Sequence, residues 1–425
     1  MASVEVLIDQ IHEFTNTGAA ISRIHLQLKQ YEEVLHSLSS QLYPLLHHFD
    51  PSDKYTLPYL YFLDAIISSP IEKEQVNELI IIITNFIKSA NAEHICLAPD
   101  KFIAVCQKFK EQILLLNDPL RGIAPLLIAM QKLQISTERL TPIHSDVLCL
   151  CLLTKSYRIG LRVLKHDIYE VDQPRDFFLY CYYGGMLLIG LKQFQRALEL
   201  LHNVITAPMS IMNAIAVEAF KKYILVSLIH NGQFSTTLPK YVSSVAQRNL
   251  KTLGQVYIDM SVLYGNGNVS DMEGFVHNHR EKFETDKNMG LVKQAVASMY
   301  KRNIQRLTQT YLTLSLQDIA TTVHLNSAKE AEMHVLQMIQ NGEIFAAINQ
   351  KDGMVSFLED PEQYKSCGMI EHLDLSIKRM SSLSKKLSAV DKLMACDPLY
   401  LTKVGRERQR FDFDDFDSVP QRFNM

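Results

Sequence analysis

The sequence predicts a mainly α-helical protein. An α-solenoid of helical, tetratricopeptide-like repeats comes first, then a winged helix with a small β-hairpin, then a long C-terminal helix. Helical periodicity continues through residues 1 to about 290, and the order helix–helix–strand–turn–strand occupies Leu307 to Phe357. Apolar residues then recur at steps of three and four after Pro361. Together these three observations predict the fold class.

The first part of the chain is a run of amphipathic segments separated by short polar breaks. Tyr31 to Leu46, Val76 to Ile87 and Phe102 to Leu116 each have helical spacing of apolar residues. Asn117-Asp118-Pro119 ends the third segment, and helical spacing resumes at Ile123. Since no segment in this part alternates like a strand, stacked helix pairs are the best interpretation.

One helix pair, Cys181 to Pro208, nearly matches the tetratricopeptide pattern. Gly185 stands on the first helix, the aromatic Phe194 at the turn and Ala197 on the second helix. Small residues are needed there because the two helices cross closely. Pro208 comes one position early and the sequence has no tryptophan, so a degenerate repeat and an ordinary αα-hairpin both stay open.

The stretch from Leu307 to Phe357 predicts the two helices of a winged helix. Ser315 with Asp318, and Ser327 with Glu330, each have the spacing of a capping box at a helix start. Each helix has one apolar face. These faces comprise Leu316, Ile319, Ala320 and Val323 on the first helix, and Ala328, Ala331, Val335, Met338 and Ile339 on the second.

A β-hairpin follows the second helix. Gly342 stands where a left-handed residue usually ends a helix. Ile344 to Asn349 then alternates like a strand, Asp352-Gly353 predicts a tight turn, and Met354 to Phe357 returns. Because a strand edge is a template for another chain, we expect one of these two strands to contact a partner.

After Pro361 the sequence predicts one long amphipathic helix. Its apolar positions are Leu373, Ile377, Met380, Leu383, Leu387, Val390 and Met394. Either this helix packs back on the body, or it joins a helical bundle with partners. In the tail, basic Arg406 to Arg410 precedes acidic Asp412 to Asp417, which indicates a solvated segment or a short docking motif.

Composition favours a soluble intracellular protein. The chain is 47% hydrophobic and 21% charged with a net charge of −3, whereas a general nucleic-acid binder usually has a basic excess. Its seven cysteines are an odd, scattered set, as expected of reduced thiols in the cytoplasm or nucleus. The N-terminus lacks the basic and apolar regions of a signal peptide, and no apolar run is long enough to span a membrane.

The sequence predicts no catalytic residue, no cofactor site and no metal site. Cys149 and Cys151, near His144, resemble metal ligands, but residues two apart on a helix point to nearly opposite sides. His277 and His279 have a spacing that suits zinc in an extended segment. The serine and aspartate of the zinc isopeptidase pattern are missing, because Lys287 and Gly290 occupy those positions.

Nucleic-acid binding is the minor hypothesis for the winged helix. The exposed positions of its second helix are predicted to be Lys329, Glu330, Glu332, His334, Gln337 and Gln340. Two acids against one lysine suit a polyanion badly. A basic cluster precedes the winged helix at Lys293, Lys301, Arg302 and Arg306, and a solvated helix face is its simplest interpretation.

A helical solenoid ending in a winged helix and a lone C-terminal helix resembles the PCI-domain proteins. These form the proteasome lid, the signalosome and a large translation initiation factor. Several stretches resemble more closely the subunit-three family of the COP-nine signalosome, in a plant-like form. They are Leu120-Arg-Gly-Ile, Tyr182-Tyr-Gly-Gly-Met, Lys221-Lys-Tyr-Ile-Leu-Val-Ser-Leu, Asn288-Met-Gly-Leu-Val-Lys-Gln, Asn303-Ile-Gln-Arg-Leu-Thr and Gly342-Glu-Ile-Phe-Ala-Ala-Ile-Asn-Gln-Lys-Asp-Gly-Met-Val-Ser-Phe.

The resemblance implies a non-catalytic scaffold subunit. In that complex, PCI subunits join through winged helices and through a bundle of C-terminal helices, with no nucleic acid and no membrane as partner. The complex removes the modifier Nedd8 from cullins, which regulates cullin-RING ubiquitin ligases, and the deneddylase is another subunit. In plants it represses photomorphogenesis, within phytochrome signalling. A proteasome-lid or initiation-factor subunit, and a winged-helix nucleic-acid binder, are the alternatives.

With the resemblance, the chain divides into N-terminal repeats (1–195), a PCI domain (196–360), a bundle helix (361–400) and a charged tail (401–425). Within the PCI domain, residues 196–290 are repeats and 291–360 the winged helix. The residues expected to bind partners are Ile344, Ala346, Ile348, Val355, Phe357, Leu373, Ile377, Met380, Leu383, Leu387 and Val390.

Overall fold

The computed structural model describes residues 21–39, 42–43, 46, 55–69, 75–359 and 366–403. Pro361 and the tail from residue 404 therefore lie outside the described residues. The chain forms two compact units, one comprising residues 1–307 with 321–325 and the other residues 308–320 with 326–425.

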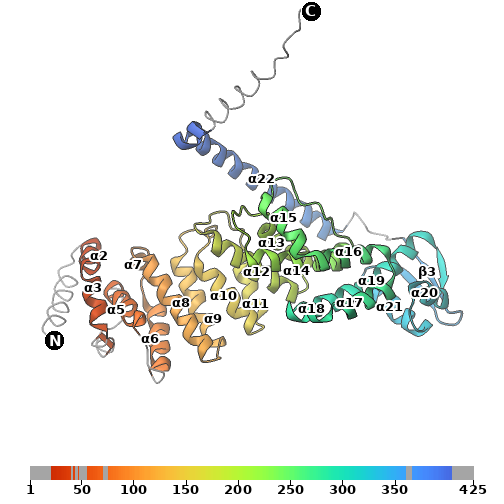
Figure 1. Cartoon of the computed structure of the whole chain (residues 1–425), viewed down its shortest axis with the longest axis horizontal. Helices are drawn as coiled ribbons and strands as arrows, with labels where there is room; N and C mark the ends of the chain where they lie inside the picture. Colours follow the sequence, from red (N-terminus) through yellow and green to blue (C-terminus); the bar gives the residue numbers. More distant parts are fainter. Residues whose placement is uncertain are drawn as a thin grey trace, which may run out of the picture. The chain divides into compact units, whose positions relative to one another are not determined.

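The first unit is a series of helices that follow one another in chain order, each pair beside the next (Figure 1). They are α2 (Ile21–Gln30), α3 (Glu32–Ser37), α5 (Thr56–Ser68), α6 (Val76–Ser89), α7 (Ala92–Ile95), α8 (Pro99–Leu115), α9 (Leu120–Leu133), α10 (Pro142–Leu153), α11 (Tyr157–Val163), α12 (Pro174–Gly190), α13 (Phe194–Thr206), α14 (Ala214–Asn231), α15 (Ser244–Leu253), α16 (Gln255–Asn266), α17 (Val269–Asn278), α18 (Arg280–Thr285) and α19 (Met289–Thr310). The predicted helical array is confirmed.

Three successive helix pairs share the same turn, which makes them structural repeats. After α8, α10 and α12 the chain takes a left-handed residue: Asn117 (φ 54°), Lys155 (φ 56°) and Lys192 (φ 58°). The next N–H then donates to a carbonyl five residues back, as in Ser156 to Cys151 and Gln193 to Leu188, both at 2.9 Å. This is a Schellman-type helix end, and its recurrence returns the chain the same way each time.

Small residues let the helices of these repeats approach closely. A Cβ at Gly185 would stand 3.0 Å from Leu201 of the following helix, and one at Gly184 would stand 2.9 Å from Leu164. A Cβ at Gly160 would overlap Leu187. The predicted close crossing around Gly185 is therefore present, and α11 packs on α12 by the same means.

A polar network connects α14 and α16 with the turn before α19. The Lys221 ammonium lies 2.8 Å from both Glu218 and Asp286, and the Tyr257 hydroxyl donates to the other Asp286 oxygen at 2.8 Å. Asn288 donates to Tyr257 at 3.0 Å. Burial raises the pKa of Asp286, but the hydrogen bonds from Lys221 and Tyr257 outweigh it and lower that pKa overall.

The winged helix contains α20 (Leu316–Val323), α21 (Ala328–Gln340) and a sheet of three strands. The strands are β1 (Thr313–Ser315), β2 (Ala346–Asn349) and β3 (Met354–Phe357), in the antiparallel order β1-β3-β2. The predicted hairpin is β2–β3. β1 was not predicted, because three residues before a helix cap are too few to show alternation.

Two local expectations need correction. Tyr31 to Leu46 is not one segment, since α2 ends at Gln30 and α3 spans only Glu32–Ser37. In the second capping box, the Ser327 hydroxyl accepts from the Glu330 N–H as expected, but the Glu330 carboxylate accepts from Asn326, one residue before the cap. The exposed Glu330 carboxylate thus satisfies a different N–H.

His144, considered above as a metal ligand, instead caps α10. Its Nδ1 accepts from the backbone N–H of Thr141 at 3.1 Å, within a capping box. Burial lowers the pKa of His144 to about 4, although the contact with Thr141 raises it somewhat. A protonated Nδ1 cannot accept a hydrogen bond, so the cap requires neutral histidine.

This cap predicts acid-sensitive stability. The unfolded chain binds a proton at His144 near pH 6.5, whereas the folded chain binds it only near pH 4. Stability is therefore full above pH 6.5 and falls as the pH drops from 6.5 to 4, by at most about 3 kcal/mol from this group. His144→Gln, which keeps a neutral acceptor, should flatten this part of the urea-unfolding profile. An unchanged slope would contradict the assignment.

Candidate partner-binding surfaces

Among the described strands, the wing sheet has two edge strands, β1 and β2, and β2 is the longer of them. β3 is central, so its backbone pairs with β1 on one side and with β2 on the other. Of the two strands expected to offer an edge, Met354 to Phe357 is therefore excluded. Among the described strands, β2 pairs with β3 alone, and its outer edge is open to another chain.

The open edge of β2 presents backbone groups, not the predicted side chains. Leu358 donates to the Phe345 carbonyl at 2.7 Å. Because bonding alternates along an antiparallel strand, the N–H groups of Ala346 and Ile348 point away from β3, toward the open edge. Their side chains face the same side as the buried Val355 and Phe357, which they oppose in the register.

The remaining predicted wing residues form the core beneath this edge. Ile344 is 5% exposed, Val355 is 0% and Phe357 is 8%. These side chains support the strand from the core side of the sheet.

The second helix of the winged helix, α21, has a less polar outer face than expected. Ala331, Val335 and Met338 are buried as predicted, but Met333 is 61% exposed and Leu336 is 47% exposed. The sequence analysis assigned only polar side chains to this face. Apolar residues on more than one face of α21 were the available signal. An apolar patch between acids suits protein contact better than a nucleic-acid groove.

The basic cluster on α19 is used partly within the fold. Arg302 packs on Gly232, and Arg306 lies near Gly267. These glycines are the left-handed residues that end α14 and α16. Gly267 and Asn268 form the turn between α16 and α17, with Asn268 capping α17. A cation at a helix C-terminus interacts favourably with the exposed carbonyls, so these arginines contribute to stability.

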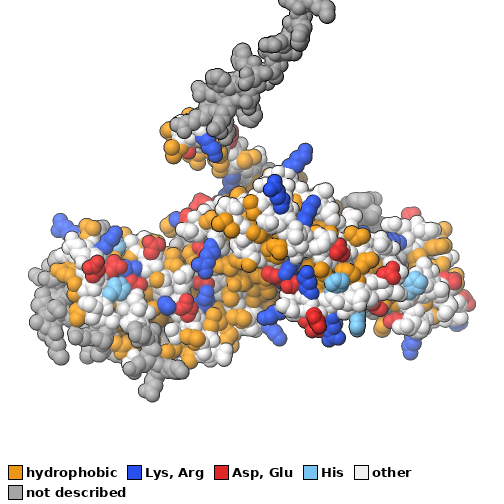
Figure 2. Space-filling model, in the orientation of Figure 1, with side chains coloured by type: hydrophobic (Ala, Val, Ile, Leu, Met, Phe, Trp, Pro, Cys, Tyr) orange, Lys and Arg blue, Asp and Glu red, His pale blue; other side chains and the backbone are white. Residues whose placement is uncertain are grey.

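The C-terminal helix, α22 (Cys367–Cys396), has no buried side chain. Its predicted apolar stripe is fully displayed, from Leu383 at 37% exposed to Leu387 at 70%. Hydrophobic side chains are visible along its described part in Figure 2. A helix of 30 residues with such an exposed apolar stripe is typical of a helix that packs against another protein surface.

The histidine pair with zinc-like spacing, His277 and His279, does not lie in an extended segment. His277 lies within α17 and His279 in the turn before α18, so the segment is not extended. His279 Nδ1 contacts the Phe275 carbonyl at 3.1 Å and its ring stacks on Phe275. Three buried cysteines of the N-terminal repeats, Cys106, Cys151 and Cys181, are thiols with pKa values raised by burial.

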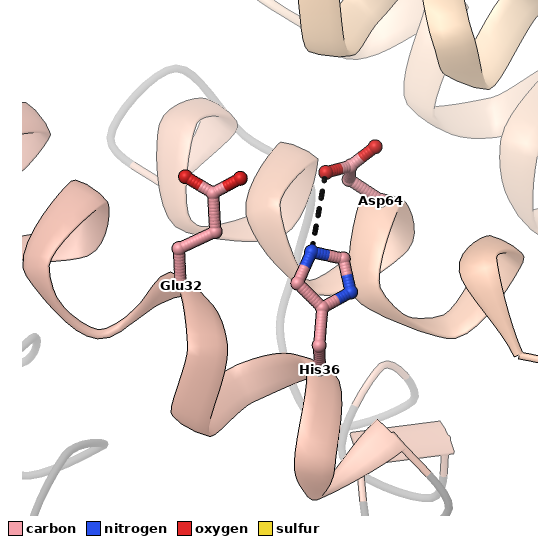
Figure 3. A group of neighbouring side chains, drawn as sticks. All are labelled: Glu32, His36 and Asp64. Carbon is pink, nitrogen blue, oxygen red and sulfur yellow. Dashed lines mark ion pairs between the residues drawn. The ribbon is translucent and has the colours of Figure 1, made fainter.

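One unpredicted cluster, Glu32, His36 and Asp64, has the ligand types of a metal site (Figure 3). The Lys101 ammonium occupies its centre, 2.7 Å from both carboxylates and over the ring of Tyr61. His36 lies 4.0 Å from Asp64. Because the lysine already supplies the positive charge, the cluster holds α3, α5 and α8 together.

The comparisons with known proteins agree with this architecture. The model of the N-terminal helical repeats of COP9 signalosome complex subunit 3 matches residues 18–246, and the PCI-domain model matches residues 276–359. COP9 signalosome complex subunit 3 of Arabidopsis thaliana is 57% identical over 424 residues, covering 100% of this chain and 99% of that protein. The chain belongs to the COP9 signalosome subunit 3 family.

A second member of the subunit 3 family is more distant. The Dictyostelium discoideum subunit is 39% identical over 329 residues, covering 76% of this chain and 78% of that protein. The PCI model includes α20, α21 and the wing sheet, so the candidate edge of β2 lies in the domain that gives the wider family its name. Among the described helices, none is long and apolar enough to cross a membrane.

The α19 arginines give a test that separates a structural from a nucleic-acid role. Arg302→Gln should lower the free energy of unfolding by about 1 kcal/mol, because the end of α14 loses its cation. Lys293→Gln, at an exposed position on the same helix, should change it by less than about 0.5 kcal/mol. Urea unfolding measures both. Equal stability of the two variants would refute the capping role.

Proposed function

We propose that this chain is a non-catalytic scaffold subunit of the COP9 signalosome. The observation that carries the proposal is the 57% identity with a protein of that name along the whole chain. The open edge of β2 and the exposed apolar stripe of α22 also support the proposal, because both kinds of surface bind other polypeptides.

In this proposal the two surfaces have different tasks. The open edge of β2 pairs through its main chain with the winged helix of a neighbouring subunit, supported from within by Ile344, Val355 and Phe357. The stripe of α22 enters a bundle with C-terminal helices of other subunits. The domain division proposed from the sequence, with residues 196–360 as the PCI domain and 361–400 as the bundle helix, fits these tasks.

The wider role follows from the resemblance and is part of the proposal. The complex removes Nedd8 from cullins and so regulates cullin-RING ligases, with the deneddylase on another subunit. The subunit acts in the cytoplasm and nucleus, and in a plant it takes part in repressing photomorphogenesis. A proteasome-lid or initiation-factor role would use the same PCI surfaces, and co-purification with mass identification of the partners separates these assignments.

The β2 edge is tested by a substitution that blocks pairing and spares the sheet. Proline at position 346 removes only an N–H that points to the open edge, so the β2–β3 pairing persists. Ala346→Pro should reduce incorporation into the large complex several-fold, measured by native size analysis after co-expression of the subunits. Ala347→Thr is the matched control. Ala347 is the next residue of β2, its side chain is exposed, and this variant should assemble normally. Normal assembly of Ala346→Pro would remove the edge from the proposal.

The α22 stripe is tested by introducing two lysines either within the apolar stripe or on the polar side of the helix. Met380→Lys with Leu387→Lys places both charges in the stripe, whereas Ser381→Lys with Ser388→Lys places them on the polar side. The first pair should prevent bundle formation, since burial of each large apolar side chain stabilises by about 1.5–3 kcal/mol. The second pair should assemble normally. Both pairs should leave the melting temperature of the isolated chain unchanged. Equal assembly of the two double variants would contradict the bundle.

A further inference from the structure

A stripe of four cations follows α11 in the helical repeats. Arg158 and Arg162 are four residues apart on the helix and share one face. Lys155 precedes the helix by two residues, and Lys165 follows Arg162 by three. All four side chains are exposed, and residues 154–166 contain no acidic residue.

A fifth cation comes from the next repeat. Lys192 occupies the same left-handed turn position after α12 as Lys155 occupies after α10. The end of α12 lies against the start of α11, because a Cβ at Gly190 would stand 3.1 Å from the Tyr157 ring. The repeat geometry therefore brings Lys192 to the same edge of the array as Lys155.

These five cations differ from those of the preceding helices. On α8 to α10 and their turns, Lys101, Lys108, Lys110, Arg121 and Arg139 each have a carboxylate partner, and Lys132 donates to two carbonyls. Arg196, on α13, donates to the Leu164 carbonyl. Among the described residues, no ion pair or side-chain hydrogen bond joins Lys155, Arg158, Arg162, Lys165 or Lys192 to another group. The positive charge of this patch is uncompensated within the described fold, and like charges this close repel one another.

An apolar side chain accompanies the patch. Leu153, the last residue of α10, is 56% exposed two residues before Lys155. A nucleic-acid phosphate backbone would make no apolar contact with an exposed leucine. An acidic peptide with apolar side chains can contact both the cations and Leu153. α11 has only 7 residues, and so short a helix suits a bound peptide better than the groove of a duplex.

We propose that α11 and the adjoining turn bind an acidic segment of a partner protein, with carboxylates on Arg158, Arg162 and the flanking lysines and an apolar side chain on Leu153. This surface includes no residue of β2 or α22, so it does not rest on the proposed assembly contacts. It gives the repeat array a recognition task in addition to its structural one.

The experiment measures peptide binding by the full chain. The probe is a fluorescein-labelled peptide of repeated Leu-Asp-Asp-Glu units, and anisotropy is recorded at low and raised salt. The triple variant Arg158→Gln, Arg162→Gln and Lys165→Gln should bind at least about tenfold more weakly than the unsubstituted chain. Binding by the unsubstituted chain should weaken as salt rises.

A matched variant removes three exposed cations elsewhere. Lys240→Gln, Arg248→Gln and Lys251→Gln, on and before α15, change the net charge equally and should alter the affinity by less than about twofold. Neither triple variant should change the melting temperature, since none of these side chains makes an ion pair or a side-chain hydrogen bond within the described fold.

Three outcomes would overturn the proposal. Equal weakening in both triple variants would mean a response to net charge alone. Unchanged affinity in the α11 variant would place the peptide elsewhere. Displacement of the peptide from α11 by a short RNA duplex at lower concentration than by unlabelled peptide would mean a nucleic-acid surface.

Discussion

The helical repeats depend on the close approach of neighbouring helices at positions without a side chain. Gly160, Gly184 and Gly185 stand where α11, α12 and α13 cross, and a Cβ at any of them would press on a leucine of the next helix. A helix pair cannot bury its apolar faces alone, so every pair relies on the next one for its core. One continuous hydrophobic cluster accordingly extends from Ile24 to Ala219.

Charged side chains inside this array are arranged to match the packing. Lys101 is held by carboxylates from α3 and α5, and Lys221 by Glu218 of its own helix and by Asp286 in the turn before α19. These ion pairs compensate the charges of the two partly buried lysines. Arg302 and Arg306 serve the ends of α14 and α16. Where the fold supplies no such partners, as along α11 and on the apolar side of α22, the surface is left for other molecules.

Periodicity in the sequence was enough to predict the helical array, the hairpin and the stripe of α22. It did not show which strand of the hairpin is central. The pairing of β3 with the three-residue β1 makes β3 central and leaves β2 at an edge. Ile344, Ala346 and Ile348 face the core side of the sheet, and their contact with a partner stays a prediction.

The sequence by itself determined the order of elements and the family, because apolar spacing, caps and long identical stretches are local properties of the chain. Only the tertiary structure decided which groups are already used. It placed His144 in a helix cap, Lys101 between carboxylates and two α19 arginines on helix ends, and within the described part of the chain it gives the α11 cations no ion pair. The contacts of Lys101 and of the arginines join residues far apart in the sequence, so no local pattern reveals them.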